Sequence, residues 1–391
     1  MNNTARIKSL VAALVAAACL SPLAGGAVTV VDVERTGAEK ILVSVDVQGT
    51  AFSRTLVRNL VLSGAFRVVK PEAAAVKVTG QAGVEVVASG RGKRLTLPSS
   101  AADDKAARME ARRFADTMTE TYAAQKGFAA TRIAFVCKKG KSEELCVGYA
   151  DGADIRQLTQ DGRASVGPRW KNADTIYYTG YLNNAPQVFE IGADEGRRRL
   201  AWGFGGLTTG ATPSPDGKTV ALILSKPFGN PELCTIDAAN GSWSRLTTTR
   251  TANEGQPAWS PDGKKIVYVS DESRRQHLYV IDVASKTKRR LTSLGSQNVD
   301  PDWGRDGRIV YTARSGGSSR ITVVDPAEGD KSAKAVTEPG NWEHPSWARD
   351  GRHVVAERDG VLFLVDTAAD GEKPVQLFAI QGKCITPSWF R

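Results

Sequence analysis

Histidine is scarce in this 391-residue chain, which contains three: His277, His344 and His353. None of them belongs to a His-Glu-x-x-His pattern, and the cysteines do not stand at the spacing of metal ligands, so no zinc-enzyme signature is present. The Gly-x-Ser-x-Gly signature of serine hydrolases is also missing from the sequence. We therefore expect no catalytic residues, no metal and no cofactor.

Long apolar runs are lacking after the first 27 residues. No later segment approaches the roughly 18 uninterrupted apolar residues of a membrane-spanning helix. Residues 1–27 carry Arg6 and Lys8, then an apolar run from Leu10 to Leu20 and small residues before Val28. This order is typical of a secretory signal, so we expect its removal and a soluble protein outside the cytoplasm. Lipidation at Cys19 remains an alternative, although Leu is missing from its usual position before that Cys.

Acidic residues are outnumbered by basic ones, 42 against 52, which gives a net charge of +10. Loss of Arg6 and Lys8 with the signal would leave +8. The remaining basic residues are dispersed through turns and strand ends. They therefore favour an acidic protein or an anionic envelope surface as the partner, and not nucleic acid.

Cysteine is also infrequent. Four cysteines follow the expected signal: Cys137, Cys146, Cys234 and Cys384. An even number in an oxidising compartment permits disulfides. A hairpin would bring Cys137 and Cys146 towards each other, so a bridge between them is one interpretation. Two unpaired buried thiols are the other.

A repeat built on Pro-x-Trp and Ser-Pro-Asp-Gly returns about every 44 residues, and such a period indicates a propeller. Its clearest copy runs from Pro257 through Asp262-Gly263 into a β-rich segment. Five units are complete. The sixth is split between the strand beginning at Arg132 and the segment Pro387–Arg391. If these two fragments pair, the ring closes without an open edge, and we predict six blades.

The residues that recur in each unit are most simply explained as scaffold. Trp170, Trp259, Trp303, Trp347 and Trp389 occupy one repeat position, which predicts packing between blades. An Asp-Gly pair supplies the tight turn of a hairpin. The aspartates of these turns are Asp216, Asp262, Asp306 and Asp350.

A different pattern precedes the propeller. Phe52, Leu56 and Leu60 recur at helical spacing, and a second helix is expected from about Asp103 with Phe114 among its apolar residues. The sequence thus predicts a mainly β protein with three parts. These are a signal peptide over residues 1–27, a small α/β domain over 28–126 and a six-bladed β-propeller over 127–391.

The junction between the two domains carries a family resemblance. Its residues run from Arg113-Phe114-Ala115-Asp116 to Gly127-Phe128 and on to Val136. Together with the domain order and the propeller repeat, this junction resembles the TolB family, the periplasmic component of the Tol-Pal system. The resemblance implies a monomeric, non-enzymatic periplasmic adaptor that supports outer-membrane integrity and envelope constriction during cell division.

The resemblance also implies two partners. One is a TolA-like inner-membrane protein, bound by strand addition through the N-terminal segment Val28, Thr29, Val30, Val31, Asp32, Val33 and Glu34. The other is a Pal-like lipoprotein, bound by loops at the propeller mouth. The residues expected there are Thr208, Thr209, Gly210, Asn253, Glu254, Gly255, Gln256, Ser296, Gln297, Asn298, Asn341, Trp342, Glu343 and His344.

Three departures from the family separate this chain from its expected relatives. Phe114 stands where His is expected, the stretch from Val76 to Asp104 is divergent, and the second unit has Ala211 in place of Pro. Two rival functions also remain. One is the remnant of a propeller-type peptidase. The other is a carbohydrate- or small-ligand-binding propeller with Trp202, Trp243 and Trp342 as platforms, unless these rings only pack in loops.

Overall fold

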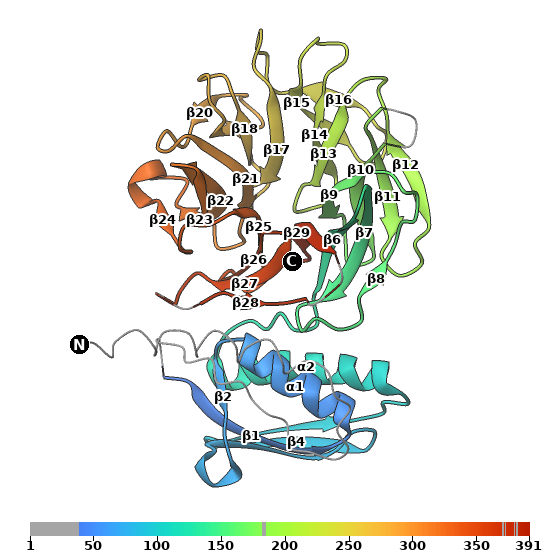
Figure 1. The fold of residues 1–391 in the computed structure, drawn as a ribbon, viewed down its shortest axis with the longest axis vertical. Helices are drawn as coiled ribbons and strands as arrows, with labels where there is room; N and C mark the ends of the chain where they lie inside the picture. The colour runs from blue at the N-terminus through green and yellow to red at the C-terminus, as the bar shows by residue number, and fades with distance from the viewer. Residues whose placement is uncertain (1–38, 182–184, 370, 372, 379, 381) are drawn as a thin grey trace, which may run out of the picture. The chain divides into compact units, whose positions relative to one another are not determined.

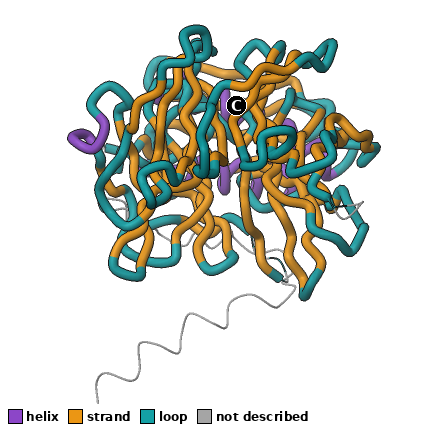
Figure 2. The backbone as a smooth tube through the Cα atoms, turned by 90° about the horizontal axis from the view of Figure 1, so that it is seen from above, coloured by secondary structure: helices purple, strands orange, loops and turns teal. Residues whose placement is uncertain are grey.

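The computed structural model describes residues 39–181, 185–369, 371, 373–378, 380 and 382–391. The expected signal peptide and the expected TolA-like segment, residues 28–34, lie outside this range. Strands are the main regular structure of the described backbone, and helices are few (Figures 1 and 2). A small α/β domain precedes a six-bladed β-propeller, which confirms the predicted fold class, and the elements of both belong to one compact unit.

The α/β domain contains a five-stranded sheet in the order β2-β1-β3-β4-β5. Strand β1 is parallel to β2 and β3, whereas β3, β4 and β5 form an antiparallel meander. The strands are β1 (Ile41–Gln48), β2 (Phe66–Val68), β3 (Val76–Gln81), β4 (Glu85–Gly90) and β5 (Lys93–Pro98), with a short 3-10 helix η1 (Pro71–Ala73) between β2 and β3.

Two helices share a core with this sheet. Helix α1 (Thr50–Leu62) buries Phe52, Leu56 and Leu60, as their spacing predicts. Helix α2 (Asp104–Ala123) begins after Asp103, whose carboxylate accepts the Ala106 N–H at 2.7 Å and caps the first turn. Figure 1 shows the two helices side by side against the sheet. Neither helix of the described chain is long and apolar enough to cross a lipid bilayer.

The propeller consists of six four-stranded antiparallel sheets. Five blades use consecutive strands. These are β9 (Ser165–Trp170), β10 (Thr175–Gly180), β11 (Gln187–Gly192) and β12 (Arg198–Trp202); β13 (Thr208–Pro213), β14 (Thr219–Leu224), β15 (Glu232–Asp237) and β16 (Trp243–Arg245); β17 (Glu254–Trp259), β18 (Lys265–Ser270), β19 (His277–Asp282) and β20 (Lys288–Arg290); β21 (Gln297–Trp303), β22 (Ile309–Ser315), β23 (Ser318–Val324) and β24 (Lys334–Ala335), with the 3-10 helix η2 (Gly329–Ser332); and β25 (Trp342–Trp347), β26 (His353–Arg358), β27 (Val361–Asp366) and β28 (Val375–Gln376).

The sixth blade joins the two ends of the propeller sequence. Strand β29 (Lys383–Trp389) pairs antiparallel with β6 (Arg132–Lys139), which continues into β7 (Ser142–Tyr149) and β8 (Arg156–Gln157). The first strands β9, β13, β17, β21, β25 and β29 contact one another in a closed ring. The ring therefore closes as the split sequence unit predicts.

The recurrent residues have the scaffold role expected from the repeat. The Trp259 indole N–H donates across to the Thr212 carbonyl of the preceding blade at 2.9 Å, and all five repeat tryptophans are buried. In the turn after it, the Asp262 carboxylate accepts the Ser260 hydroxyl at 2.6 Å and the Lys264 N–H at 3.1 Å. These contacts fix the tight hairpin.

Arg112 links the α/β domain to the propeller. Its side chain, 1% exposed, reaches from α2 to the turn after β7, where Nε lies 2.7 Å from Asp151 Oδ2 and Nη1 lies 2.8 Å from Asp154 Oδ2. The guanidinium also stacks 3.8 Å over the ring of Tyr149. From α1, the Asn59 amide donates to Asp151 at 3.0 Å. Both helices are thus anchored to one propeller loop.

Candidate functional site

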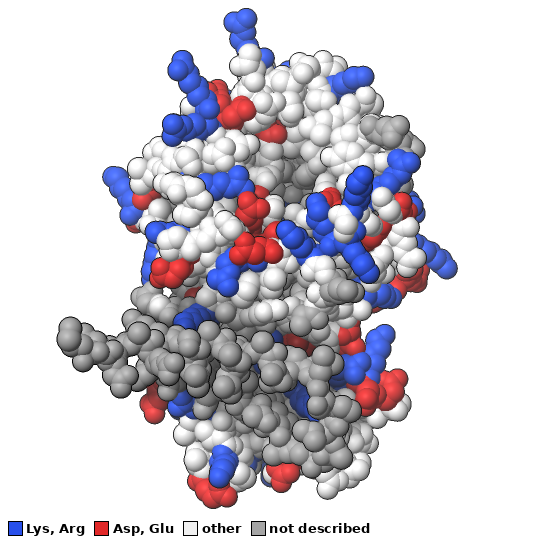
Figure 3. All heavy atoms as spheres, in the orientation of Figure 1, with Lys and Arg blue, Asp and Glu red and all other residues white. Residues whose placement is uncertain are grey.

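The six inner strands begin at the same end of the central channel. We call this end the channel mouth; it comprises the first residues of the inner strands and the loops that precede them. Those first residues are Ser165, Thr208, Glu254, Gln297, Trp342 and Lys383. Basic and acidic side chains are interspersed over the face shown in Figure 3, and the basic ones do not gather into one patch.

A bulge interrupts every inner strand just inside the mouth. At each bulge one residue has a positive φ. These residues are Gly167, Gly210, Gln256, Asp300, His344 and Thr386, with φ from 47° to 71°. A left-handed backbone is uncommon outside glycine and concentrates at functional positions. The six residues line a cavity of about 290 Å³ inside the channel.

Four polar side chains form a chain of contacts along one side of this cavity. Gln256 Nε2 donates to Asp300 Oδ1, and the Asp300 N–H donates back to Gln256 Oε1 at 2.9 Å. His344 lies between two carboxylates, with Nδ1 3.1 Å from Glu357 Oε2 and Nε2 3.7 Å from Asp300 Oδ1. Burial lowers the pKa of His344, but the carboxylates of Asp300 and Glu357 outweigh it and raise the pKa to about 8.

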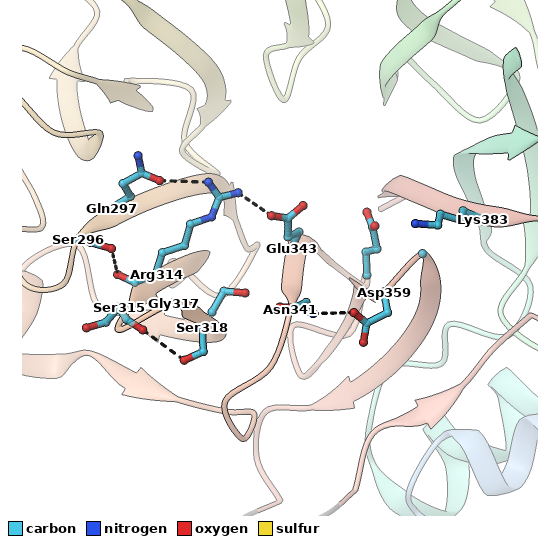
Figure 4. Close-up of a pocket in the computed structure, with 13 residues that line it drawn as sticks. Ser296, Gln297, Arg314, Ser315, Gly317, Ser318, Asn341, Glu343, Asp359 and Lys383 are labelled. Atoms are coloured by element: carbon cyan, nitrogen blue, oxygen red, sulfur yellow. Dashed lines mark hydrogen bonds and ion pairs between the residues drawn. The ribbon is translucent and has the colours of Figure 1, made fainter. Parts of the chain in front are cut away.

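A hollow of about 460 Å³ opens beside this chain, between the blades that begin with β21 and β25. We call it the mouth pocket (Figure 4). On one side Arg314 donates to Glu343 at 2.7 Å and to Gln297 at 3.1 Å, and on the other Asn341 donates to Asp359 at 2.8 Å. The lining residues are Ser296, Gln297, Arg314, Ser315, Gly317, Ser318, Ser319, Asn341, Glu343, Glu357, Asp359, Gly360 and Lys383.

The residues expected to bind a Pal-like partner separate into two groups. Ten are at least partly exposed: Thr209, Gly210, Asn253, Gly255, Gln256, Ser296, Gln297, Asn341, Glu343 and His344. Four are buried, at 4% exposure or less: Thr208, Glu254, Asn298 and Trp342. The buried side chains support the mouth from within and offer no surface to a partner.

Sequence reasoning missed part of the mouth pocket. Arg314 and Glu357 lie on the second strands β22 and β26, and Asp359 follows β26, whereas Lys383 begins the inner strand β29. None of the four was among the expected residues, yet they line the pocket. Strand pairing could have identified one of them, because the hairpin after each inner strand returns the chain to the mouth and places Glu357 opposite Glu343. The Pro-x-Trp repeat marks the inner strands alone, so it does not reveal which residues of the second strands reach the mouth.

One group at the mouth has the composition of a cation site. Glu343, His344 and Glu357 each offer a ligand atom, and these atoms lie within 4.8 Å of one another. In the structure Arg314 pairs with Glu343 at 2.7 Å, and His344 Nδ1 lies 3.1 Å from Glu357 Oε2. The three residues therefore belong to a network of charged groups at the mouth.

The three tryptophans considered as sugar platforms differ in exposure. Trp342 is 1% exposed and packs edge-on against Phe363, so its face is closed to a ligand. Trp202 is half-buried and packs with Tyr177 at 5.3 Å between ring centres. Trp243 is 40% exposed. The three rings lie in three different blades, and packing within their own blades accounts for Trp202 and Trp342.

The cysteines lie on strands of two blades. Cys137 on β6 and Cys146 on β7 form a disulfide, with their Cα atoms 6.1 Å apart. Cys234 and Cys384 are free and buried. Burial raises the pKa of each of these two thiols to about 12, so both are inert neutral groups of the core.

The comparison with known families covers the propeller and the end of α2. Residues 119–391 match the family described as the TolB beta propeller domain. The chain belongs to this family. The Tol-Pal system protein TolB of Gluconobacter oxydans (strain 621H) is 28% identical to it over 143 residues, 35% of this chain. That match spans 31% of the relative's own length.

Solved structures of the family confirm the architecture. TolB from Acinetobacter baumannii matches with a TM-score of 0.78 and 21% identity, over 92% of this chain and 98% of that one. A putative TolB from Agrobacterium tumefaciens matches with a TM-score of 0.52 and 18% identity, over 65% and 90%. A nidogen/laminin complex matches with a TM-score of 0.54 and 11% identity, over 66% of this chain and 98% of that one. The propeller fold is therefore shared well beyond TolB proteins, and function has to be argued from the mouth.

Proposed function

We propose that this protein is a non-enzymatic periplasmic adaptor of the Tol-Pal system. In this proposal the channel mouth binds a Pal-like lipoprotein and residues 28–34 bind a TolA-like inner-membrane protein. The protein would then link the two membranes and support outer-membrane integrity and constriction during division. The observation that carries the proposal is the family match over residues 119–391.

The chemistry of the mouth pocket supports a protein as the ligand. Its walls combine charged, amide and hydroxyl side chains, and several of these groups, including Asn341 and Asp359, are exposed. Such a mixed polar surface provides the directional hydrogen bonds that give specificity at a protein interface. The bulges add a rigid frame, because each fixes the backbone where an inner strand enters the channel.

The proposal is tested by titrating the purified chain against the soluble domains of both partners. Ser318→Arg should obstruct the mouth pocket and weaken binding of the Pal-like lipoprotein at least about tenfold, because a desolvated charge would stand where the partner packs. Val30→Pro removes one N–H donor from the expected added strand, so it should abolish TolA-like binding alone.

Ser242→Arg is the matched control, since Ser242 is exposed in the turn before β16, away from the mouth. It should leave both affinities unchanged. If Ser318→Arg binds the lipoprotein as well as the unmodified chain does, the mouth is not the binding surface. Loss of both partners in either single variant, at an unchanged melting temperature, would contradict two separate surfaces.

A further inference from the structure

The end of the channel opposite the mouth contains a second, larger cavity of about 570 Å³. We call it the exit chamber. Five basic side chains and a single acidic side chain line it, together with the tryptophans that end the inner strands. The charged lining residues are Lys126, Arg169, Lys171, Arg305, Arg391 and Asp302.

Arg169 is the innermost of these cations, because it lines both the exit chamber and the central cavity. Its Nη1 donates to the neighbouring Pro168 carbonyl at 3.0 Å. Within the described part of the chain, no carboxylate lies within 4 Å of the guanidinium. Burial lowers the pKa of Arg169. The negative charge of Asp302 raises this pKa, but it does not outweigh the effect of burial. A guanidinium so enclosed is stabilised by any anion that can reach it.

The one acidic side chain of the chamber already has hydrogen-bond and ion-pair partners. Asp302 accepts from Arg391 Nη2 at 2.8 Å through one oxygen, and from the Trp347 N–H at 2.8 Å through the other. Lys171 pairs with Glu190 at 3.0 Å. The cations at Lys126 and Arg305 are exposed, and no ion pair within the described residues involves them. Three cations thus remain for a ligand.

Aromatic rings share the rest of the chamber wall with prolines and with serine and threonine residues. The indole N–H groups of Trp170 and Trp259 donate to backbone carbonyls of neighbouring blades at 2.9 Å, and that of Trp389 donates to the Thr131 hydroxyl at 2.8 Å. These rings therefore present apolar surface to the cavity and not hydrogen-bond donors.

We infer that the exit chamber binds a compact multivalent anion that carries phosphate or carboxylate groups. Arg169 binds it at depth, and Lys126 and Arg305 bind it at the rim. The site is distinct from the mouth pocket, so a partner at the mouth does not compete directly for it.

Isothermal titration of the full chain with pyrophosphate, and separately with citrate, tests this inference. No residues should be added after Arg391, and sodium chloride should hold the ionic strength constant. Saturable binding of one anion per chain is the expected result, and the stronger of the two ligands identifies whether phosphate or carboxylate is the natural group. Absence of saturable binding by both anions overturns the inference.

Two substitutions locate the anion. Arg169→Gln should weaken binding at least about tenfold, and Arg305→Gln, at an exposed position, should weaken it about threefold without risk to folding. The matched control is Arg197→Gln, because Arg197 has a side chain 88% exposed and far from the channel lining. Equal affinity in Arg169→Gln and the unmodified chain, or equal loss in Arg197→Gln, would show that the anion binds elsewhere.

Discussion

Two buried glutamates stand close together at the mouth end of β15 and β17. Glu232 is fully buried, and its carboxylate has strong partners. It pairs with Arg245 at 2.6 Å and accepts a hydrogen bond from the Thr247 hydroxyl at 2.6 Å. Glu254 has weaker support, with the Ser270 hydroxyl at 3.1 Å. Burial, and then repulsion from Glu232, raise the pKa of Glu254 from 4.5 to about 7. Glu254 therefore holds a proton at mildly acidic pH.

This protonation makes stability depend on pH. Between pH 4.5 and about 7 the folded chain holds a proton at Glu254 that the unfolded chain has lost, so stability falls as the pH rises through this window. Glu254→Gln keeps the neutral form. At pH 8 it should increase the free energy of unfolding by up to about 3 kcal/mol, and at pH 4.5 it should have little effect. Urea unfolding at both pH values measures the difference.

Glu195→Gln is the matched control for this experiment, because Glu195 is 68% exposed. The same gain in stability at both pH values for Glu254→Gln would show that the carboxylate is not the cause.

The strand β29 is the element on which ring closure depends. Its Trp389 is 2% exposed, lies edge-on to Phe128 with 5.2 Å between ring centres, and donates to the Thr131 hydroxyl at 2.8 Å. Trp389→Ala should therefore reduce the free energy of unfolding by about 3–5 kcal/mol, as expected for a large buried aromatic side chain. Deletion of residues 387–391 should cost more, since the inner edge of β6 would be left unpaired.

Trp243→Ala provides the comparison, because Trp243 is 40% exposed and ends no inner strand. Denaturant unfolding should place it within about 1 kcal/mol of the unmodified chain. A similarly small effect for Trp389→Ala would mean that the last strand adds nothing to closure.

Sequence reasoning succeeded where local chemistry repeats. Asp262-Gly263 and its counterparts predict the hairpins, and the split sixth unit predicts closure of the ring. Both features depend on the type and order of residues along the chain. It failed where tertiary contacts determine the backbone conformation or the burial of a residue. Gln256 and His344 adopt a left-handed backbone without a glycine to mark it. Trp342 stands outside the repeat position yet is buried by its own blade, since Phe363 covers it.

At the scale of the whole molecule, the two domains are joined through the Arg112 cluster. Arg112→Met would leave Asp151, whose side chain is 3% exposed, without its ion-pair partner, whereas Asp154 would keep its pair with Arg108 at 2.6 Å. We expect a loss of about 3–5 kcal/mol, because an unpaired buried charge is strongly destabilising. The α/β domain and the propeller should then unfold in separate calorimetric transitions.

Arg113→Met tests whether the effect belongs to the cluster. Arg113 is the next residue of α2 but is exposed, so this variant should unfold as the unmodified chain does. A single transition in Arg112→Met at an unchanged temperature would show that the domains are coupled by other contacts.

Closure of the ring also sets an order of events during synthesis. Thr131 and Trp389 are 258 residues apart, yet they meet in one blade. The strands β6, β7 and β8 leave the ribosome early, and their inner edge has no partner until the last residues of the chain arrive. Five blades have to be completed before the first one can be. The nascent protein therefore carries an open sheet edge for most of its production, and it is during this interval that a holding chaperone protects it best.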